Sequence, residues 1–498
     1  MSTAPTTTTI AADASLPVVI QGGMGVAVSS WPLARAVALT GQLGVVSGTA
    51  LDVVLARRLQ DGDPGGHLRR ALDHFPVPEI ADRIRDRYFR PEGRVPKQPY
   101  APTPQLTVRQ TRAAQELAVV GNFVEVWLAK EGHQGLVGIN FLEKVQMATP
   151  AAAYGAMLAG VDYVLMGAGI PRELPCLLDR LARHEVGQVN VDVHGAATPF
   201  RMELDPVALL SVTLPPLRRP KFLAIVSAHV LATYLARDPE TRPDGFVVEG
   251  PRAGGHNAPP RGALLLDEDG QPVYGTRDEA DLGKIAALGL PFWLAGTYGT
   301  PDQVVAALAA GAAGVQVGPL FALSRESGFA GGIREQLLRQ VATETLDVRT
   351  DPLASPTGFP FKVAQLPGTV ADDNVYRERP RLCDLGYLRV PYVRESGEVG
   401  YRCASEPVSH YLRKGGAIED TVGRKCLCNA LAANVGIAQT RRSGYTELPL
   451  VTLGADLDGA QAFSRVHQGD WSATEAVAWL LSAVTAPDSR RDRQPAAP

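Results

Sequence analysis

The sequence has little of what a membrane, secreted or nucleic-acid-binding protein needs. Five cysteines in 498 residues do not make a disulfide scaffold, and their odd number leaves at least one thiol unpaired, so we expect a reducing cytoplasmic location. No apolar run reaches the roughly 18 residues that span a bilayer, and residues 1–15 lack the basic start of a secretory signal. A net charge of -3 gives no electrostatic reason to expect nucleic acid or a membrane surface, so a small-molecule partner is expected.

What the sequence does have is apolar content in a regular alternation. Hydrophobic residues make up 45% of the chain, enough for one large domain and a smaller unit. Short Val/Ile/Leu-rich runs, each followed by a turn and a helix-like stretch, recur to about residue 325 and predict parallel strands. The eight predicted strands are 17–21, 43–47, 136–141, 162–166, 222–227, 245–249, 291–295 and 314–317. Eight such units favour a closed (β/α)8 TIM barrel, with a doubly wound sheet as the alternative.

Local signals divide the chain further. Ser30, Thr149 and Thr300 each precede an early proline and predict helix starts. Three intervals are too long for simple connections and are interpreted as insertions or lids: 50–135, 186–220 and 257–288. The alternation stops beyond residue 330. The predicted organisation is a disordered N-terminus (1–15), the barrel (16–330), a C-terminal, mainly helical accessory region (331–485) and a disordered tail (486–498).

The most informative motif is the strand 245–249 that runs into Gly254, Gly255 and His256. The two glycines allow backbone to pass close to a planar ligand, and His256 can exchange a proton near neutral pH. We therefore predict that His256 is a catalytic base. An ordinary strand-to-loop turn with a surface histidine is the alternative.

Glycines and small polar residues follow most of the other predicted strands. Ligands in a barrel lie at the carboxyl ends of the strands, so these residues are expected to share one site. They are Gly22, Gly23, Met24, Asn140, Ser227, Gly296, Thr297, Gly299 and Gly318, in addition to Gly254 and Gly255. The loops after the last two strands predict a phosphate-bearing cofactor, because unpaired amides there can face an anion. His229 is a second histidine considered for the site, with a surface position as the alternative.

Five of these segments together resemble nitronate monooxygenases, formerly called 2-nitropropane dioxygenases. In order and spacing over residues 17–325, the segments are 21–25, 138–141, 249–256, 294–299 and 310–318. The wider superfamily includes FMN-dependent enoyl reductases. The resemblance implies non-covalently bound FMN, with Gly22, Gly23 and Met24 against the flavin, Asn140 hydrogen-bonded to it, Gly296, Thr297 and Gly318 around the phosphate, and His256 as base. Two departures are Pro319, where a threonine is common, and Pro251-Arg252, where an acid is common.

The implied reaction is oxidation of an alkyl nitronate, or a related small substrate, by dioxygen to a carbonyl compound and nitrite, without nicotinamide. An alternative from the same superfamily is an NAD(P)H-dependent enoyl reductase that acts on a substrate bound to a carrier protein. A non-catalytic flavin-binding or scaffold protein is a third hypothesis. The sequence does not fix the oligomeric state, and a homo-oligomer is among the states left open.

Four of the five cysteines fall in the accessory region. Cys383, Cys403, Cys426 and Cys428 could together form a four-thiolate zinc site. The usual pair of two-spaced Cys knuckles is absent, so ordinary reduced thiols are the alternative. The basic stretch around Cys426 could also lower thiol pKa values. Cys176 lies on a predicted barrel helix and is expected in the core.

Overall fold

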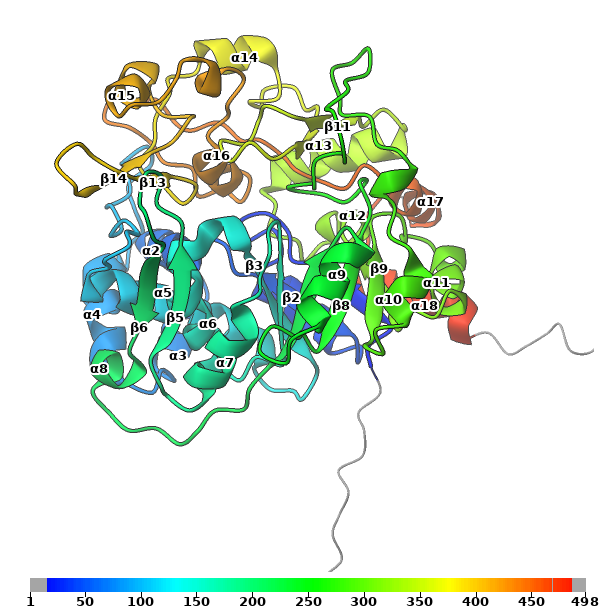
Figure 1. The fold of residues 1–498 in the computed structure, drawn as a ribbon, viewed down its shortest axis with the longest axis horizontal. Coiled ribbons are helices and arrows are strands. Elements are labelled where there is room, and N and C mark those ends of the chain that lie inside the picture. Colours follow the sequence, from blue (N-terminus) through cyan, green and yellow to red (C-terminus); the bar gives the residue numbers. More distant parts are fainter. Residues whose placement is uncertain (1–15, 468, 486–498) are drawn as a thin grey trace, which may run out of the picture.

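A closed barrel of eight parallel strands forms the centre of the protein. The computed structural model describes residues 16–467 and 469–485, so the predicted disordered ends lie outside the described residues. The strand order around the barrel is β1-β10-β9-β8-β7-β4-β3-β2, and Figure 1 shows the barrel with helices around it. The bounds are β1 Val19–Gln21, β2 Leu43–Ser47, β3 Val137–Leu142, β4 Tyr163–Gly167, β7 Lys221–Val226, β8 Gly245–Glu249, β9 Phe292–Ala295 and β10 Gly314–Val317. The TIM-barrel prediction is confirmed.

Along each strand, alternate side chains point into the barrel and fill its interior. A separate apolar cluster there includes Val45, Leu165, Leu223, Val247 and Trp293. Side chains of the intervening strand residues face the surrounding helices, which explains why the strands are apolar on both faces. Several polar or small residues lie at the carboxyl ends of the strands, where a site can form.

Helices surround the barrel. Their bounds are α1 Trp31–Ala38, α2 Leu51–Gln60, α3 His67–Leu72, α4 Pro78–Tyr88, α5 Arg112–Lys130, α6 Thr149–Leu158, α7 Leu174–Ala182, α9 His229–Ala236, α10 Leu282–Ala286 and α11 Pro301–Ala309. Thr300 caps α11 as predicted, since its Oγ1 accepts from the Gln303 amide. Ser30 does not cap α1 with its side chain; the Trp31 amide instead donates to Glu125 Oε1 at 2.7 Å. Cys176 on α7 is exposed, so its predicted core position is wrong.

The three long intervals contain regular structure. The first holds α2, α3, α4 and the barrel helix α5. A hairpin of β5 Gly187–Val191 and β6 Phe200–Leu204, followed by α8 Pro206–Leu210, occupies the second. The third is an extended loop with η2 Thr276–Asp278 and α10. A further short helix, η1 Glu143–Ala148, follows β3. None of the helices in the described part of the chain is long and apolar enough to cross a membrane.

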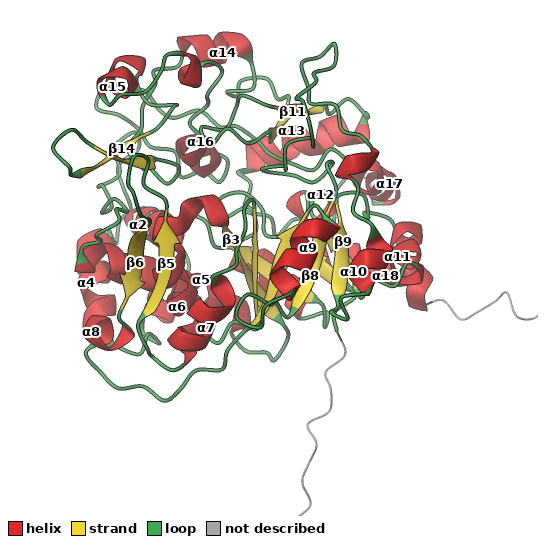
Figure 2. Cartoon of the chain, viewed as in Figure 1, coloured by secondary structure: helices red, strands yellow, loops and turns green. Residues whose placement is uncertain are grey.

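The region after β10 lies over the carboxyl ends of the barrel strands (Figure 2). It contains short helices and two small antiparallel hairpins. The bounds are α12 Pro319–Ala322, α13 Gly331–Ala342, β11 Val348–Asp351, β12 Phe361–Ala364, α14 Asp373–Glu378, β13 Val390–Val393, β14 Val399–Arg402, α15 Val408–Arg413, η3 Glu419–Thr421, α16 Leu427–Ala433, α17 Asp458–Val466 and α18 Ala473–Thr485.

The last helix returns to the barrel wall. Helix α18 packs against α11 and α1, the helices that follow β9 and β1. This is the position of the eighth helix of a (β/α)8 barrel. The accessory structure is therefore an insertion between the last strand and the last helix, and both of its ends are fixed to the barrel.

Candidate functional site

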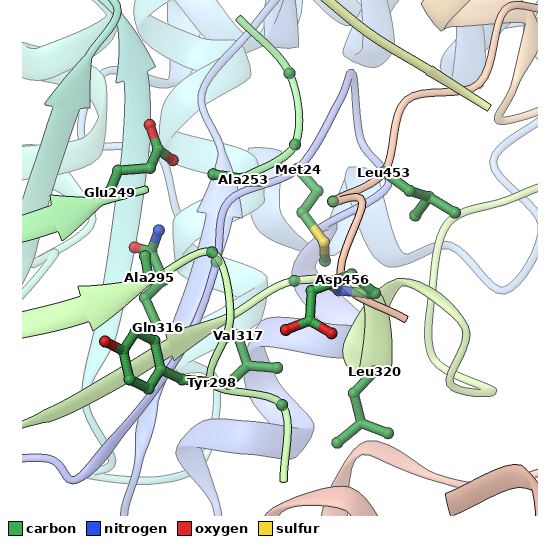
Figure 3. Close-up of a pocket in the computed structure, with 18 of the residues that line it drawn as sticks. Met24, Glu249, Ala253, Ala295, Tyr298, Gln316, Val317, Leu320, Leu453 and Asp456 are labelled. Atoms are coloured by element: carbon green, nitrogen blue, oxygen red, sulfur yellow. The ribbon is translucent and has the colours of Figure 1, made fainter. Parts of the chain in front are cut away.

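Two adjoining cavities open at the carboxyl ends of the barrel strands. The first is lined by residues at the ends of β1, β8, β9 and β10 and by the segment 452–460 (Figure 3). It holds about 850 Å³ of space including its open mouth. The second lies between β3, β8 and the accessory region. The two share Gly23, Gly25, Glu249, Gly254, Gly255, Gln316 and Thr452, so one extended ligand could occupy both.

Tight backbone packing explains two of the predicted glycines. A Cβ on Gly23 would lie 2.3 Å from Cβ of Asn140, so no side chain fits there. A Cβ on Gly254 would lie 2.9 Å from the Gly454 nitrogen, which shows that Gly254 also lets the accessory region approach. Gly255 has φ +77°, a left-handed conformation that favours glycine. These glycines position both the cavity wall and the histidine that follows.

His256 lies at the second cavity in a largely apolar setting. Its Nε2 is 2.7 Å from Ser355 Oγ, which in turn is 2.8 Å from Thr357 Oγ1. The ring also packs edge-on against Phe361, with centroids 4.8 Å apart. Burial lowers the pKa of His256 to about 4, and the positive charge of Lys144 acts in the same direction. The imidazole is therefore neutral at physiological pH and available as a proton acceptor.

The accessory region holds the backbone on both sides of His256. The Gly255 amide donates to Thr452 Oγ1 at 3.0 Å, and the Gly255 carbonyl accepts from the Lys362 amide at 2.9 Å. The Asn257 amide donates to the Pro360 carbonyl at 2.9 Å. The position of the predicted base thus depends on residues more than 100 positions later in the chain, where the sequence offered no motif.

The loops after β9 and β10 provide free amide donors. Within the described residues, the backbone N–H groups of Tyr298, Gly299 and Gly318 have no hydrogen-bond acceptor. Such amides at the first cavity suit an anionic phosphate. Asp456 also lines this cavity, and burial raises its pKa. Its carboxyl is suited to hydroxyl groups rather than to a phosphate. Glycine walls, free amides and a hydroxyl-binding acid together fit a flavin nucleotide.

Two inward-facing polar residues at strand ends escaped the sequence analysis. Glu249 ends β8, and Gln316 lies in β10; both line both cavities. Oε1 of Gln316 is buried without a hydrogen-bond partner in the described structure. Burial raises the pKa of Glu249 to about 7. The signal that could have found them is a polar residue at an inward position of an otherwise apolar strand.

Most of the predicted site residues gather around the two cavities. The first cavity is lined by Gly22, Gly23, Met24, Gly254, Gly255, Gly296, Gly299 and Gly318, and the second adds Asn140 and His256. Ser227 instead lines a separate small pocket beside Asn257, and Thr297 is not among the residues around either main cavity. His229 accepts a hydrogen bond from the Asp281 amide at 3.3 Å and lines neither main cavity.

The accessory region supplies an apolar wall to the second cavity. Its residues are Tyr387, Leu388, Leu427, Cys428 and Leu431. Tyr387 is further fixed by its hydroxyl, which donates to buried Asp52 on α2. A ligand in this cavity would thus have His256 on one side and an apolar surface on the other. This arrangement suits a small substrate with an acidic C–H bond and an alkyl body.

The cysteines give no support for zinc. No group of three or more His, Cys, Asp or Glu side chains within residues 16–485, apart from residue 468, is arranged to hold a metal ion. All five cysteines are free. Burial raises the pKa of Cys426 to about 11 despite the positive charge of Arg379, so the expected lowering of this thiol pKa by its basic surroundings does not occur.

One family of known proteins matches the part of the chain that contains His256. The family model for nitronate monooxygenase matches residues 218–351, from the start of β7 to the end of β11, including the His256 turn. The predicted resemblance to nitronate monooxygenases is confirmed. The protein is thus an enzyme, a flavin-dependent oxidoreductase resembling nitronate monooxygenases. No curated protein matches the chain.

Several solved structures are similar over nearly the whole chain. FabK from Thermotoga maritima has 14% sequence identity and a TM-score of 0.47, covering 94% of this chain and 93% of its own. Nitroalkane oxidase from Streptomyces ansochromogenes has 15% identity and a TM-score of 0.45, covering 95% and 98%. The enoyl reductase domain of MlnA from the macrolactin cluster of Bacillus amyloliquefaciens has 11% identity and a TM-score of 0.45, covering 94% of each chain. Similarities this distant carry no argument about activity.

Proposed function

We propose that the protein is an FMN-dependent monooxygenase that converts alkyl nitronates, or a related small substrate, and dioxygen into a carbonyl compound and nitrite. The observation that carries the proposal is His256, kept neutral by its lowered pKa, at an apolar-walled cavity that adjoins a glycine-lined one. FMN, when bound, supplies the electron acceptor for the oxidation. The protein supplies the base, the cofactor cradle and the shape of the substrate cavity.

The residues that would hold FMN are the predicted glycines and the free amides. Gly22, Gly23 and Met24 provide a wall without bulky groups near the backbone, and Asn140 adds a side-chain amide close to Gly23. The amides of Tyr298, Gly299 and Gly318 would face the phosphate. The amide missing at Pro319 is thereby compensated by neighbouring donors.

His256 would take the α-proton of a nitroalkane. With Nε2–H donating to Ser355 Oγ, the other ring nitrogen, Nδ1, would be the one to accept the proton. Ser355 holds the ring in place, and Phe361 restricts its rotation. For a substrate supplied as the nitronate, no deprotonation is needed, and His256 would then not act as a base.

The experiment that tests this proposal measures nitrite release with a short-chain nitronate in air-saturated buffer. The expected result is a nitrite-producing turnover that needs FMN and no nicotinamide. Consumption of NADPH with an enoyl thioester, in the absence of nitrite production, would replace the proposal with the enoyl reductase alternative and its carrier-protein partner. Bound flavin without either turnover would reject both the nitronate and the enoyl thioester as substrates.

A further inference from the structure

Four of the protein's five thiols come together in the accessory region, although they belong to three separate segments. Cys383 precedes β13, Cys403 follows β14, and Cys426 and Cys428 lie at the start of α16. The other three thiols lie close enough to Cys403 for a charge on its sulfur to act on them. Within the described residues the cluster does not form a metal site, so metal binding does not explain the contacts between its thiols.

Cys383 and Cys403 are in direct contact. The Cys383 thiol donates a hydrogen bond to the Cys403 sulfur, which also lies 3.2 Å from Ser405 Oγ. The hydrogen bonds from Cys383 and Ser405 lower the pKa of Cys403, because they favour its thiolate. The bond to Cys403 and burial raise the pKa of Cys383. The pair therefore combines a sulfur that favours the thiolate with a protonated thiol beside it.

Hydrogen bonds on both sides of Cys383 hold its segment against the other two. Arg381 donates through Nη2 to the Ala404 carbonyl at 2.7 Å, which ties the segment to the residue after Cys403. Asp384 Oδ1 accepts from Asn429 Nδ2 at 2.7 Å, which ties it to α16. The contact between the two thiols is therefore fixed by their neighbours in the chain as well as by the thiols themselves.

We propose that Cys383 and Cys403 form a redox-active thiol pair that a hydroperoxide oxidises to a disulfide. The Cys403 thiolate attacks the O–O bond, takes up one oxygen as a sulfenic acid and releases water or an alcohol. The Cys383 thiol then attacks this sulfur, the S–O bond breaks, and the oxygen leaves as water with the thiol proton. The two thiols lose two electrons and two protons, and one hydroperoxide is reduced.

The thiol cluster adjoins both solvent and the second cavity. Cys383 is partly exposed, Cys403 is buried, and Cys428 lines the cavity. A disulfide between Cys383 and Cys403 would tie the segment that carries Tyr387 and Leu388 to the end of β14. Because Tyr387 and Leu388 also line the second cavity, the covalent link would restrain part of its apolar wall.

The first experiment oxidises the reduced, full-length protein with hydrogen peroxide and maps its thiols. Titration after unfolding should show that two of the five thiols are lost, and dithiothreitol should restore both. Tryptic digestion without reduction should give one linked pair of peptides, 382–389 and 403–413, because trypsin cleaves after arginine. Cys176→Ser is the matched control and should give the same linked pair, since Cys176 lies exposed on α7.

The second experiment separates the attacking thiol from its partner. In Cys383→Ser the sulfenic acid at Cys403 has no thiol to condense with, so dimedone should label Cys403 about tenfold more than in the wild type. In Cys403→Ser the nucleophile is absent, so neither the linked pair nor dimedone labelling of Cys383 is expected. Equal labelling of Cys383 and Cys403 in the two variants would overturn the assignment of Cys403 as the attacking thiol.

The pH dependence of disulfide formation tests the Cys403 thiolate. The rate should fall as pH drops through the lowered pKa of Cys403, with a midpoint below the ordinary thiol pKa of about 8.5. Ser405→Ala removes one hydrogen bond to the sulfur and should move the midpoint upward. The other titratable groups around Cys403, on its own segment and on those packed against it, are Cys383, Glu406, Tyr411, Cys426, Cys428 and Arg381.

The peptide map decides the proposal without any variant. A link between peptides 403–413 and 426–441 would overturn Cys383 as the partner. Retention of all five thiols, or oxidation of Cys403 beyond the sulfenic acid in place of a disulfide, would overturn the redox pair itself. Oxidation and mapping need neither FMN nor a nitronate, so each of these outcomes is distinguishable from failure of the proposed function.

Discussion

The barrel and the accessory region contribute to the site in different ways. The barrel supplies backbone: glycines, free amides and strand-end side chains whose directions are set by register. The accessory region supplies side chains around His256 and Gly255, namely Ser355, Phe361 and Thr452. The barrel strands thus build the glycine-lined wall, and the inserted segment surrounds the histidine beside it. Both contributions meet at His256.

The two regions are also held together differently. The barrel is a continuous ladder of parallel strands, whereas the accessory region has two separate two-stranded hairpins and packs through apolar residues of the main core cluster. Its own segments are also joined by polar contacts. One of these is the buried ion pair of Arg379 and Glu447 at 2.8 Å, which Arg441 extends by contacting the same carboxyl group. Substitutions in the barrel should therefore affect FMN binding. Substitutions in the accessory region should affect turnover through His256 or the stability of the insertion.

The largest effect is expected where the two regions meet. His256→Gln should lower kcat/KM for a nitroalkane by about 1,000-fold, because it removes the proton acceptor. FMN should remain bound with unchanged affinity. His229→Gln is the matched control, since His229 lines neither main cavity. Nitrite assays and flavin titration measure both properties. Full turnover in His256→Gln would contradict the assignment of the base.

The next largest effect is expected for a variant that destabilises the accessory region and leaves the predicted FMN-binding residues unchanged. Glu447→Gln leaves the buried Arg379 guanidinium without a counter-charge and should lower the unfolding free energy by about 3 kcal/mol. Urea unfolding followed by circular dichroism measures the shift. Glu398→Gln, in an exposed pair with Arg394, should change stability by less than about 0.5 kcal/mol. Equal effects of the two variants would show that the buried pair does not hold the insertion.

A substitution at one of the predicted FMN-binding glycines should weaken FMN binding specifically. Gly23→Ala places a Cβ against Asn140 and should raise the FMN Kd by about 30-fold, because the strand end must shift. Gly275→Ala is a suitable control, since it has open space around its Cβ position and an extended backbone. Fluorescence titration of FMN compares them. An unchanged Kd in Gly23→Ala would remove Gly23 from the cofactor site.

A smaller effect is expected at the hydroxyl that orients the base. Ser355→Ala should lower kcat for a nitroalkane by about tenfold and leave the FMN Kd unchanged, because the imidazole loses its hydrogen bond. Ser355→Thr should restore part of the activity, and Ser443→Ala on the surface should have no effect. Loss of FMN affinity in Ser355→Ala would show a general structural role instead of a positioning one.

The smallest effect is expected from pH. The pKa of His256 is lowered by burial to about 4, so the base is unprotonated above about pH 5. At saturating FMN, kcat/KM for a nitroalkane should vary less than about twofold between pH 5.5 and 8. The lowered pKa also means that stability falls as pH drops from about 6.5 toward 4, where unfolded chain binds a proton that the folded state excludes. A fall in kcat/KM as pH drops through about 6.5 would contradict a base that is neutral at these pH values.

Sequence patterns predicted the barrel and the part of the candidate site that lies on it, because the signals for both are local in the sequence. Short, continuously apolar runs and glycine-rich strand ends are local signals, so the eight strands and the place of His256 after one of them could be predicted directly. Ser355, Phe361 and Thr452 reach His256 through the tertiary fold, and no local pattern marks them. Glu249 was visible in the motif, but its direction follows only from the register with Ala295.

The errors have similar causes. Ser30 has the residue type of a cap, yet the carboxylate of Glu125 from α5 satisfies the first amide of α1. Cys176 was assigned to the core from residue type, although its helical position faces solvent. The clustered cysteines suggested zinc from spacing in sequence, whereas their arrangement within the described residues does not form a metal site. In each case tertiary geometry overrode a residue preference.

The most direct measurement is an absorbance spectrum of the purified protein, followed under anaerobic conditions by addition of a nitronate and, separately, of NADPH. A yellow protein whose flavin absorbance bleaches with the nitronate alone is the expected result. Bleaching only with NADPH would contradict the nitronate monooxygenase function and favour the reductase. A colourless protein that cannot be reconstituted with FMN would contradict the flavin site itself.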